Sequence, residues 1–160
     1  MTSAEGGRGA AQSTTLRRRV TLVAAIGTGG AVGAAARYGT ELAVPASPAG
    51  FPVATLLVNV VGAVILGAIA ALPAAWLAAH ALTRPAIGTG FCGGLTTFST
   101  MTLEIYERWA GHTPVAAAYA AVSLVAAPAC AWTGFSLAST ALSALRERQS
   151  PPAPQRKVQK

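Results

Sequence analysis

Apolar residues gather in four long stretches, at about 20–38, 52–72, 85–106 and 114–145. The first three are close to the ~20 residues that a helix rising about 1.5 Å per residue needs to cross a hydrocarbon core of about 30 Å. The fourth is longer, so it can tilt or project beyond the bilayer. This pattern predicts an all-α membrane protein with four transmembrane helices.

The segments outside these stretches look different. Residues 1–16 are small and polar, and residues 146–160 carry proline and charge in place of a periodic pattern. Such segments bury too little apolar surface to offset the entropy of ordering. We therefore expect a membrane domain over residues 17–145 with a disordered basic tail on each side. A cleaved signal peptide is the alternative for residues 17–36, but the apolar run continues to Arg37 and three similar stretches follow.

The composition supports a membrane protein. Of 160 residues, 52% are hydrophobic and only 11% are charged, which is more apolar than a typical soluble domain. Cys92 and Cys130 lie inside apolar stretches and lack metal-ligand spacing. We expect both to pack as small apolar side chains.

Charge predicts how the chain is oriented. With four crossings, both termini share one side with Arg84, and that side holds ten of the twelve Lys and Arg. The other side has only Arg108, while Arg37 ends the first stretch. The positive-inside rule then predicts cytoplasmic termini in the plasma membrane. The net charge of +7 lies mostly in the tails, not on a basic face with interleaved aromatics, so we expect no nucleic-acid partner.

Polar side chains recur at membrane depth, where they are costly and usually face a partner or a pathway. In the second stretch Thr55 and Asn59 are four residues apart, on one helix face. In the third stretch Thr97, Thr100 and Glu104 share a face at i, i+3 and i+7. A plain hydrogen bond between helices is the structural alternative for Asn59.

Weaker polar signals come from two other positions. Tyr119 and Ser123 are four residues apart in the fourth stretch, although a tyrosine in a span is often an interface anchor. Arg37 closes the first stretch, where a lone cation can also snorkel to the interface.

Glycines are frequent in the same stretches. Gly29 and Gly33 form a GxxxG spacing, which favours close helix packing in lipid. The third stretch contains GFCGGLTTFST, in which Gly90, Gly93 and Gly94 each lower helix propensity by up to about 1 kcal/mol. A break there would offer backbone groups to an ion, since such groups are tolerated at membrane depth only inside protein or a cavity. A continuous, closely packed helix is the alternative.

Three motifs, in order, resemble those of the CrcB/Fluc family of fluoride channels. They are GGAVGAAARY at 29–38, TLLVNVVG at 55–62 and GFCGGLTTFST at 90–100, and the similarity covers about residues 20–142. The resemblance implies four helices per subunit with the third broken. It also implies two subunits packed antiparallel, with two narrow fluoride pathways along their interface.

The resemblance also implies roles for individual residues. Gly93 and Thr96 are similar to residues whose backbone carbonyls, two from each subunit, hold a structural Na⁺. Asn59 resembles the pore asparagine that meets fluoride, and Phe98 the first of two phenylalanines whose ring edges face the ion. Arg37 resembles the arginine near the aqueous entrance. The implied polar lining comprises Thr55, Thr97, Ser99, Thr100, Glu104, Tyr119 and Ser123.

One position departs from the family pattern. Where the family usually has its second phenylalanine, this chain has Met101. Methionine has no aromatic ring edge to offer an anion. Either that part of the lining is inactive here or the partner subunit supplies it.

Physical chemistry agrees with a fluoride pathway. Fluoride is small and strongly hydrated, so a pore must replace its water with many donors in a narrow space. Amide, hydroxyl and aromatic groups do this without a nucleophile or an organic cofactor, so we do not expect an enzyme. Hydrogen fluoride enters cells and dissociates, and a passive channel at negative membrane potential would expel the anion and reduce its toxicity.

The expected partners are fluoride, membrane lipid and a second subunit. The bias of ten cations to one predicts a single orientation, and hence an oppositely oriented homologue as that subunit. The alternative is an antiparallel homodimer. A small dual-topology multidrug-type exporter is a rival function, but it needs a carboxylate in an early helix, and the first two stretches contain none. A non-transporting scaffold protein is the other rival, and it would not need the polar stripe.

Overall fold

The computed structural model describes Ser3–Gln149, with side chains over residues 15–148. All regular structure in this range is helical, and none of these residues lies in a strand. The prediction of an all-helical chain is therefore confirmed. The elements are α1 (Ser3–Ala43), α2 (Val53–Ala70), α3 (Ala74–Ala79), the π-helix η1 (Arg84–Cys92), α4 (Gly93–Leu95), α5 (Phe98–Trp109) and α6 (Thr113–Gln149).

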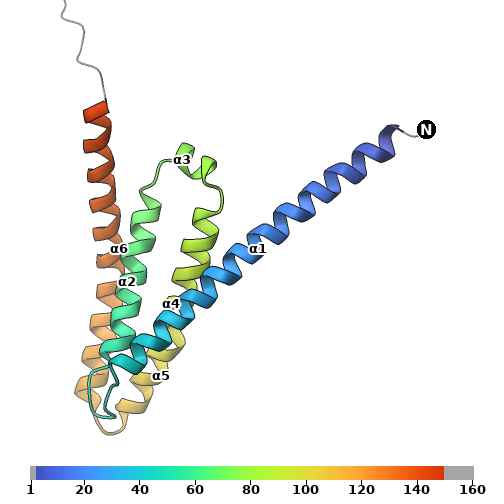
Figure 1. Cartoon of the computed structure of the whole chain (residues 1–160). Helices are drawn as coiled ribbons and strands as arrows, with labels where there is room; N and C mark the ends of the chain where they lie inside the picture. The colour runs from blue at the N-terminus through green and yellow to red at the C-terminus, as the bar shows by residue number, and fades with distance from the viewer. Residues whose placement is uncertain (1–2, 150–160) are drawn as a thin grey trace, which may run out of the picture.

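The helices form an elongated bundle (Figure 1). Helix α2 packs mainly against α6, while α1 packs against η1 and α4. The start of α1, the short helix α3 and the end of α6 lie toward one end of the bundle, and the α1–α2 and α5–α6 connections lie at the other (Figure 1). The N-terminal half of α1 projects away from the remaining helices (Figure 1).

Three helices are long and apolar enough to cross a membrane: Thr15–Ala43, Val53–Ala70 and Thr113–Arg148. The remaining apolar stretch is divided among η1, α4 and α5. None of these pieces reaches the ~20 residues needed for a crossing by a single helix.

The N-terminal segment differs from its prediction. Helix α1 begins at Ser3 and so includes most of residues 1–16, which were expected to be disordered. Residues 3–43 contain no proline, so nothing in the sequence forces the helix to stop before the first span. Residues 146–149 likewise continue α6. The disorder expected for residues 150–160 lies outside the described residues.

Glycine allows α1 to approach η1 closely. A Cβ at Gly29 would collide with the carbonyl oxygen of Ala86, and one at Gly33 would collide with that of Phe91. The packing role expected for this GxxxG spacing is therefore confirmed. Gly67 has the same function where α2 meets α6.

Replacing Gly33 with alanine should lower the free energy of unfolding by about 1–3 kcal/mol, because the added methyl group meets backbone atoms that cannot rotate away. Gly27→Ala, on the same helix, is the matched control, since nothing lies within 4 Å of the Cβ it would add. Both can be measured by unfolding in mixed micelles with increasing SDS. Equal stability of the two variants would contradict this account of the helix contact.

Candidate functional site

The helical path between α4 and α5 is interrupted by two residues with extended backbone. Thr96 has φ −82° and ψ 153°, and Thr97 has φ −149° and ψ 125°. Both are β-branched residues, which suit extended conformations. The hydroxyl of Thr96 donates to the carbonyl of Cys92 at 2.8 Å. The chain then resumes as α5 at Phe98.

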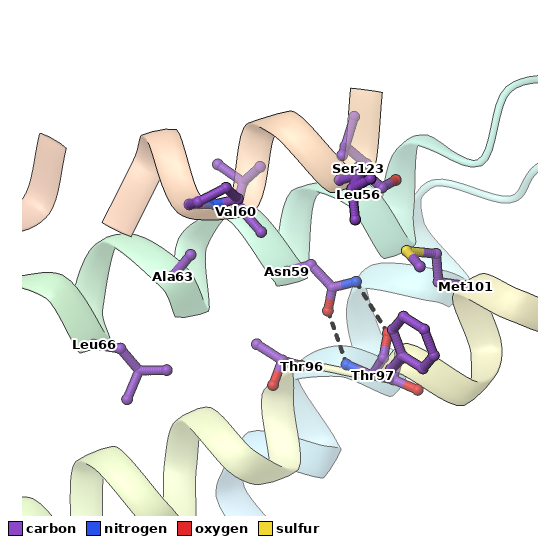
Figure 2. A pocket seen from close by; sticks show the side chains of 13 residues that line it. Leu56, Asn59, Val60, Ala63, Leu66, Thr96, Thr97, Met101 and Ser123 are labelled. Carbon is purple, nitrogen blue, oxygen red and sulfur yellow. Dashed lines mark hydrogen bonds between the residues drawn. The ribbon is translucent and has the colours of Figure 1, made fainter. Parts of the chain in front are cut away.

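Asn59, in α2, binds the interruption through its side-chain amide. Its Nδ2 donates to the carbonyl of Thr97 at 3.0 Å, and the N–H of Thr97 donates to its Oδ1 at 2.8 Å (Figure 2). The interhelical hydrogen bond considered as an alternative for Asn59 is thus present. It uses only part of the amide, since none of the described residues accepts the second Nδ2 hydrogen.

These bonds change the partners of two carbonyl groups. In a continuous α-helix, the N–H groups of Thr97 and Thr100 would donate to the carbonyls of Gly93 and Thr96, four residues earlier. Here the N–H of Thr97 donates to Asn59, and the N–H of Thr100 donates to the Thr97 hydroxyl at 3.1 Å. The carbonyls of Gly93 and Thr96 are thereby released from their helical donors.

Released carbonyls suit a hard cation such as Na⁺. The described residues contain no cluster of three or more His, Cys, Asp or Glu side chains that could hold a metal. The carbonyls of Gly93 and Thr96 are the two groups that were expected from the sequence to bind Na⁺.

A small hydroxyl cluster caps the start of α5. The Thr97 oxygen accepts the N–H of Thr100, which is the usual geometry of an N-cap. The Thr97 hydroxyl also donates to that of Thr100 at 3.0 Å and lies 3.3 Å from that of Ser99. These three residues, expected as polar lining, therefore also satisfy one another.

A pocket of about 510 Å³ opens beside the interruption and is bounded by α2, α5 and α6 (Figure 2). Its polar groups come from Asn59, Thr96, Thr97 and Ser123, and the rest of its lining is apolar. The hydroxyl of Ser123 is buried and has no hydrogen-bond partner among the described residues. Leaving such a group unpaired costs about 1–3 kcal/mol.

Phe98 and Met101 line the same pocket. The Phe98 side chain is 75% exposed in the single chain. A large apolar ring at membrane depth is therefore available for contact with another molecule.

A second cluster forms around the carboxylate of Glu104. Thr55 donates to its Oε1 at 2.8 Å, and the hydroxyl of Tyr119 donates to its Oε2 at 2.7 Å. Thr55 and Tyr119 are both buried. One carboxylate thus joins α2, α5 and α6, on the side of the interruption nearer the α5–α6 connection.

The structure brings Arg37 to the interruption. Its Nε donates to the carbonyl of Gly94 at 3.3 Å, and its Nη1 forms an ion pair with Glu41 at 3.2 Å. The guanidinium group therefore binds the glycine-rich segment and does not simply extend toward the interface. Its positive charge is partly offset by Glu41.

Sequence reasoning missed the environment of Arg108, which it treated only as the single cation on its side of the membrane. In the structure this side chain is buried. No spacing in the sequence signals this burial, because it depends on carbonyls of Ser47 and Gly50, which lie 61 and 58 residues away.

Comparison with known proteins finds a family match and several similar channels. The family described as "CrcB-like protein, Camphor Resistance (CrcB)" matches residues 24–135. Fluoride-specific ion channel FluC 1 of Streptomyces coelicolor is 39% identical over 135 residues, covering 84% of this chain and 86% of the relative. Fluoride-specific ion channel FluC of Chlorobaculum tepidum is 41% identical over 114 residues, covering 71% and 90%. Fluoride-specific ion channel FluC 1 of Mycobacterium tuberculosis is 46% identical over 106 residues, covering 64% and 78%.

The N-cap at Thr97 gives a test that does not depend on function. Thr97→Ala should lower the free energy of unfolding by about 1 kcal/mol, because the N–H of Thr100 loses its acceptor. Thr97→Ser keeps the hydroxyl and is the matched control. SDS titration in mixed micelles measures both, and identical unfolding curves for the two variants would contradict the capping role.

Proposed function

Because the chain belongs to the CrcB family, we propose that it is a fluoride-specific passive ion channel that lets fluoride leave the cytoplasm. It is a membrane transport protein and not an enzyme. The observation that carries the proposal is the pocket beside the interruption. There the Asn59 amide keeps one N–H free, and the buried Ser123 hydroxyl has no partner among the described residues.

These groups match what fluoride requires. The ion gives up its water only if several donors replace it in a confined space. The free N–H of Asn59 and the hydroxyl of Ser123 are two such donors. Phe98 lines the same pocket, and the edge of its ring carries partial positive charge. The apolar remainder of the lining excludes water and so strengthens each of these contacts.

We further propose that the chain crosses the membrane four times. Helices α1, α2 and α6 each cross once, and η1, α4 and α5 together make the remaining crossing, interrupted at Thr96 and Thr97. Four crossings leave both termini on one side, which agrees with the arrangement in Figure 1. The basic residues of the tails favour the cytoplasm for that side.

The carbonyls of Gly93 and Thr96 would hold a structural Na⁺. Two oxygens do not replace the hydration shell of this ion, so the site requires equivalent carbonyls from a second subunit. When bound, the ion would add positive potential near the anion route. Asn59 and Thr97 prepare the site, because they bind the N–H groups that would otherwise occupy both carbonyls.

The exposed Phe98 ring lines the open pocket, where a second subunit would enclose it. An antiparallel partner would place its own residues opposite Met101, where this chain lacks an aromatic edge. Since the chain carries ten of its twelve Lys and Arg on one side, we favour an oppositely oriented homologue as that partner. An antiparallel homodimer is the alternative.

The described residues do not favour the multidrug-type exporter that the sequence left as a rival. Glu41 is the one carboxylate in the described side chains of α1, and it lies at the helix end in an ion pair with Arg37. Helix α2 contains no acidic residue. A substrate cation would therefore find no unpaired carboxylate in these two spans.

Fluoride efflux from liposomes tests the proposed channel. Protein reconstituted with its partner subunit should release fluoride, but not chloride, after valinomycin is added to potassium-loaded vesicles. Asn59→Ala should slow this release at least about tenfold, because it removes a donor from the pathway and the two hydrogen bonds that hold the interruption. Val61→Ala on the same helix is exposed and outside the pocket, and serves as the control. No release above that of empty vesicles would reject the channel, and wild-type release by Asn59→Ala would remove Asn59 from the pathway.

Fusions of a reporter to the C-terminus test the orientation. A cytoplasmic reporter should be active and a periplasmic or extracellular reporter inactive, because the tail cations stay inside. Replacing Arg17, Arg18 and Arg19 with glutamine should raise the share of the opposite orientation. Comparable activity of both reporters on the unmodified chain would contradict a single orientation and support the homodimer.

A further inference from the structure

Arg108 is a buried cation bound by backbone oxygens. The residue is only 5% exposed. Its Nε donates to the carbonyl of Gly50 at 2.8 Å, its Nη1 to that of Glu104 at 2.9 Å and its Nη2 to that of Ser47 at 3.3 Å. No described carboxylate lies within ion-pair distance of it.

Burying a guanidinium group without a carboxylate costs free energy, so we expect it to have a function. Removing a guanidinium group from water costs several kcal/mol, and carbonyl oxygens offset this without neutralising the charge. The planar fork of arginine can bind several oxygens at fixed angles, which lysine cannot do. Each of the three guanidinium nitrogens of Arg108 donates to a different backbone carbonyl. Arg108 therefore holds the backbone and not another side chain.

The backbone that it fixes is the connection between α1 and α2. Residues 44–52 contain no helix or strand, and three of them are prolines, which lack an N–H. Within this connection the hydrogen bonds are few, one of them from the N–H of Gly50 to the carbonyl of Ser47. Arg108 binds the carbonyls of both residues and so ties the connection to α5.

The connection in turn contacts the Glu104 cluster. Phe51 follows Gly50 directly, and its ring meets that of Tyr119 edge-on, with centroids 5.3 Å apart and planes at 81°. Tyr119 donates its hydroxyl to Glu104. A chain of contacts therefore joins Arg108 to the connection, the connection to Tyr119, and Tyr119 to Glu104. Glu104 lies one turn before Arg108 on α5 and accepts a hydrogen bond from it.

We propose that Arg108 is a positioning residue of the channel. By holding the carbonyls of Ser47 and Gly50, it keeps Phe51 against Tyr119. Tyr119 is then kept on the Glu104 carboxylate, which would otherwise be free to turn toward the passing anion and repel it. The inference rests on the proposed function, because it concerns the rate at which fluoride passes this end of the pathway.

Fluoride efflux of reconstituted variants tests the proposal. Arg108→Gln should slow fluoride release about tenfold, which is within the range found for coupled residues. Arg108→Lys keeps the charge but loses the fork that binds three carbonyls, so it should slow release nearly as much as Arg108→Gln. Arg84→Gln, at an exposed cation near the other end of the bundle, is the matched control and should stay within about twofold.

A double-mutant cycle separates positioning from simple loss of stability. In a Glu104→Gln background the carboxylate charge is gone, so Arg108→Gln should then change the rate by less than about twofold. A purely structural role would slow both backgrounds equally. Amide hydrogen exchange over residues 44–52 gives a readout without fluoride, and it should be faster in Arg108→Gln but unchanged in Arg84→Gln.

The outcomes are distinct. An unmodified channel that releases no fluoride rejects the proposed function. A conducting channel in which Arg108→Gln is as fast as the unmodified chain, or slows both backgrounds equally, overturns the positioning role. If Arg108→Gln does not assemble, Phe51→Leu decides, because it removes the ring contact with Tyr119 and leaves the arginine in place. Fluoride release by Phe51→Leu must be slow when Glu104 is unchanged and near normal when it is combined with Glu104→Gln. Any other result overturns the proposal.

Discussion

The paired hydrogen bonds between the Asn59 amide and the backbone of Thr97 are the interaction on which the rest of the site depends. A polypeptide at membrane depth must satisfy its N–H groups within the protein. Asn59 supplies the acceptor and donor that let Thr97 leave the helix. Without that partner an extended residue here would carry unpaired groups at a cost of several kcal/mol, and a continuous helix would be favoured.

Three charged side chains are likewise bound by polar groups of the protein. Arg37 and Arg108 both donate to backbone carbonyls, one next to the interruption and the other at the α1–α2 connection. Glu104 is bound by two hydroxyls. Arg108 and Glu104 are therefore held by dipoles that leave most of their charge in place, whereas Arg37 also pairs with Glu41. Such groups can shape the potential of a pathway while remaining fixed.

Much of the architecture could be predicted because it follows from local rules. The apolar stretch at 52–72 appears as α2 at Val53–Ala70, and the spacing of Gly29 and Gly33 marked a close helix contact. Gly90, Gly93 and Gly94 predicted a break in this region, but all three are helical and the extended residues are Thr96 and Thr97, just after them. The early start of α1 was not predicted, because weak helix propensity does not prevent a proline-free segment from continuing a helix.

Other features depended on contacts between segments far apart in the chain. The sequence suggested that Asn59 is either interhelical or part of a pathway. In the structure its amide makes the interhelical bonds and lines the pocket. The burial of Arg108 depends on the conformation of a connection 58 residues away. No periodic pattern encodes that conformation. The π-helical winding of η1, which packs against α1, was likewise not predicted.

Released carbonyls at Gly93 and Thr96 have a consequence for genetics. A main-chain oxygen is present whatever side chain the codon specifies, so no missense change can delete it. For the Na⁺ site proposed above, random mutagenesis would therefore miss the two oxygens and collect its hits at neighbours that redirect the N–H groups, namely Asn59 and Thr97. Such a map would mark the residues beside the proposed ion and not its ligands.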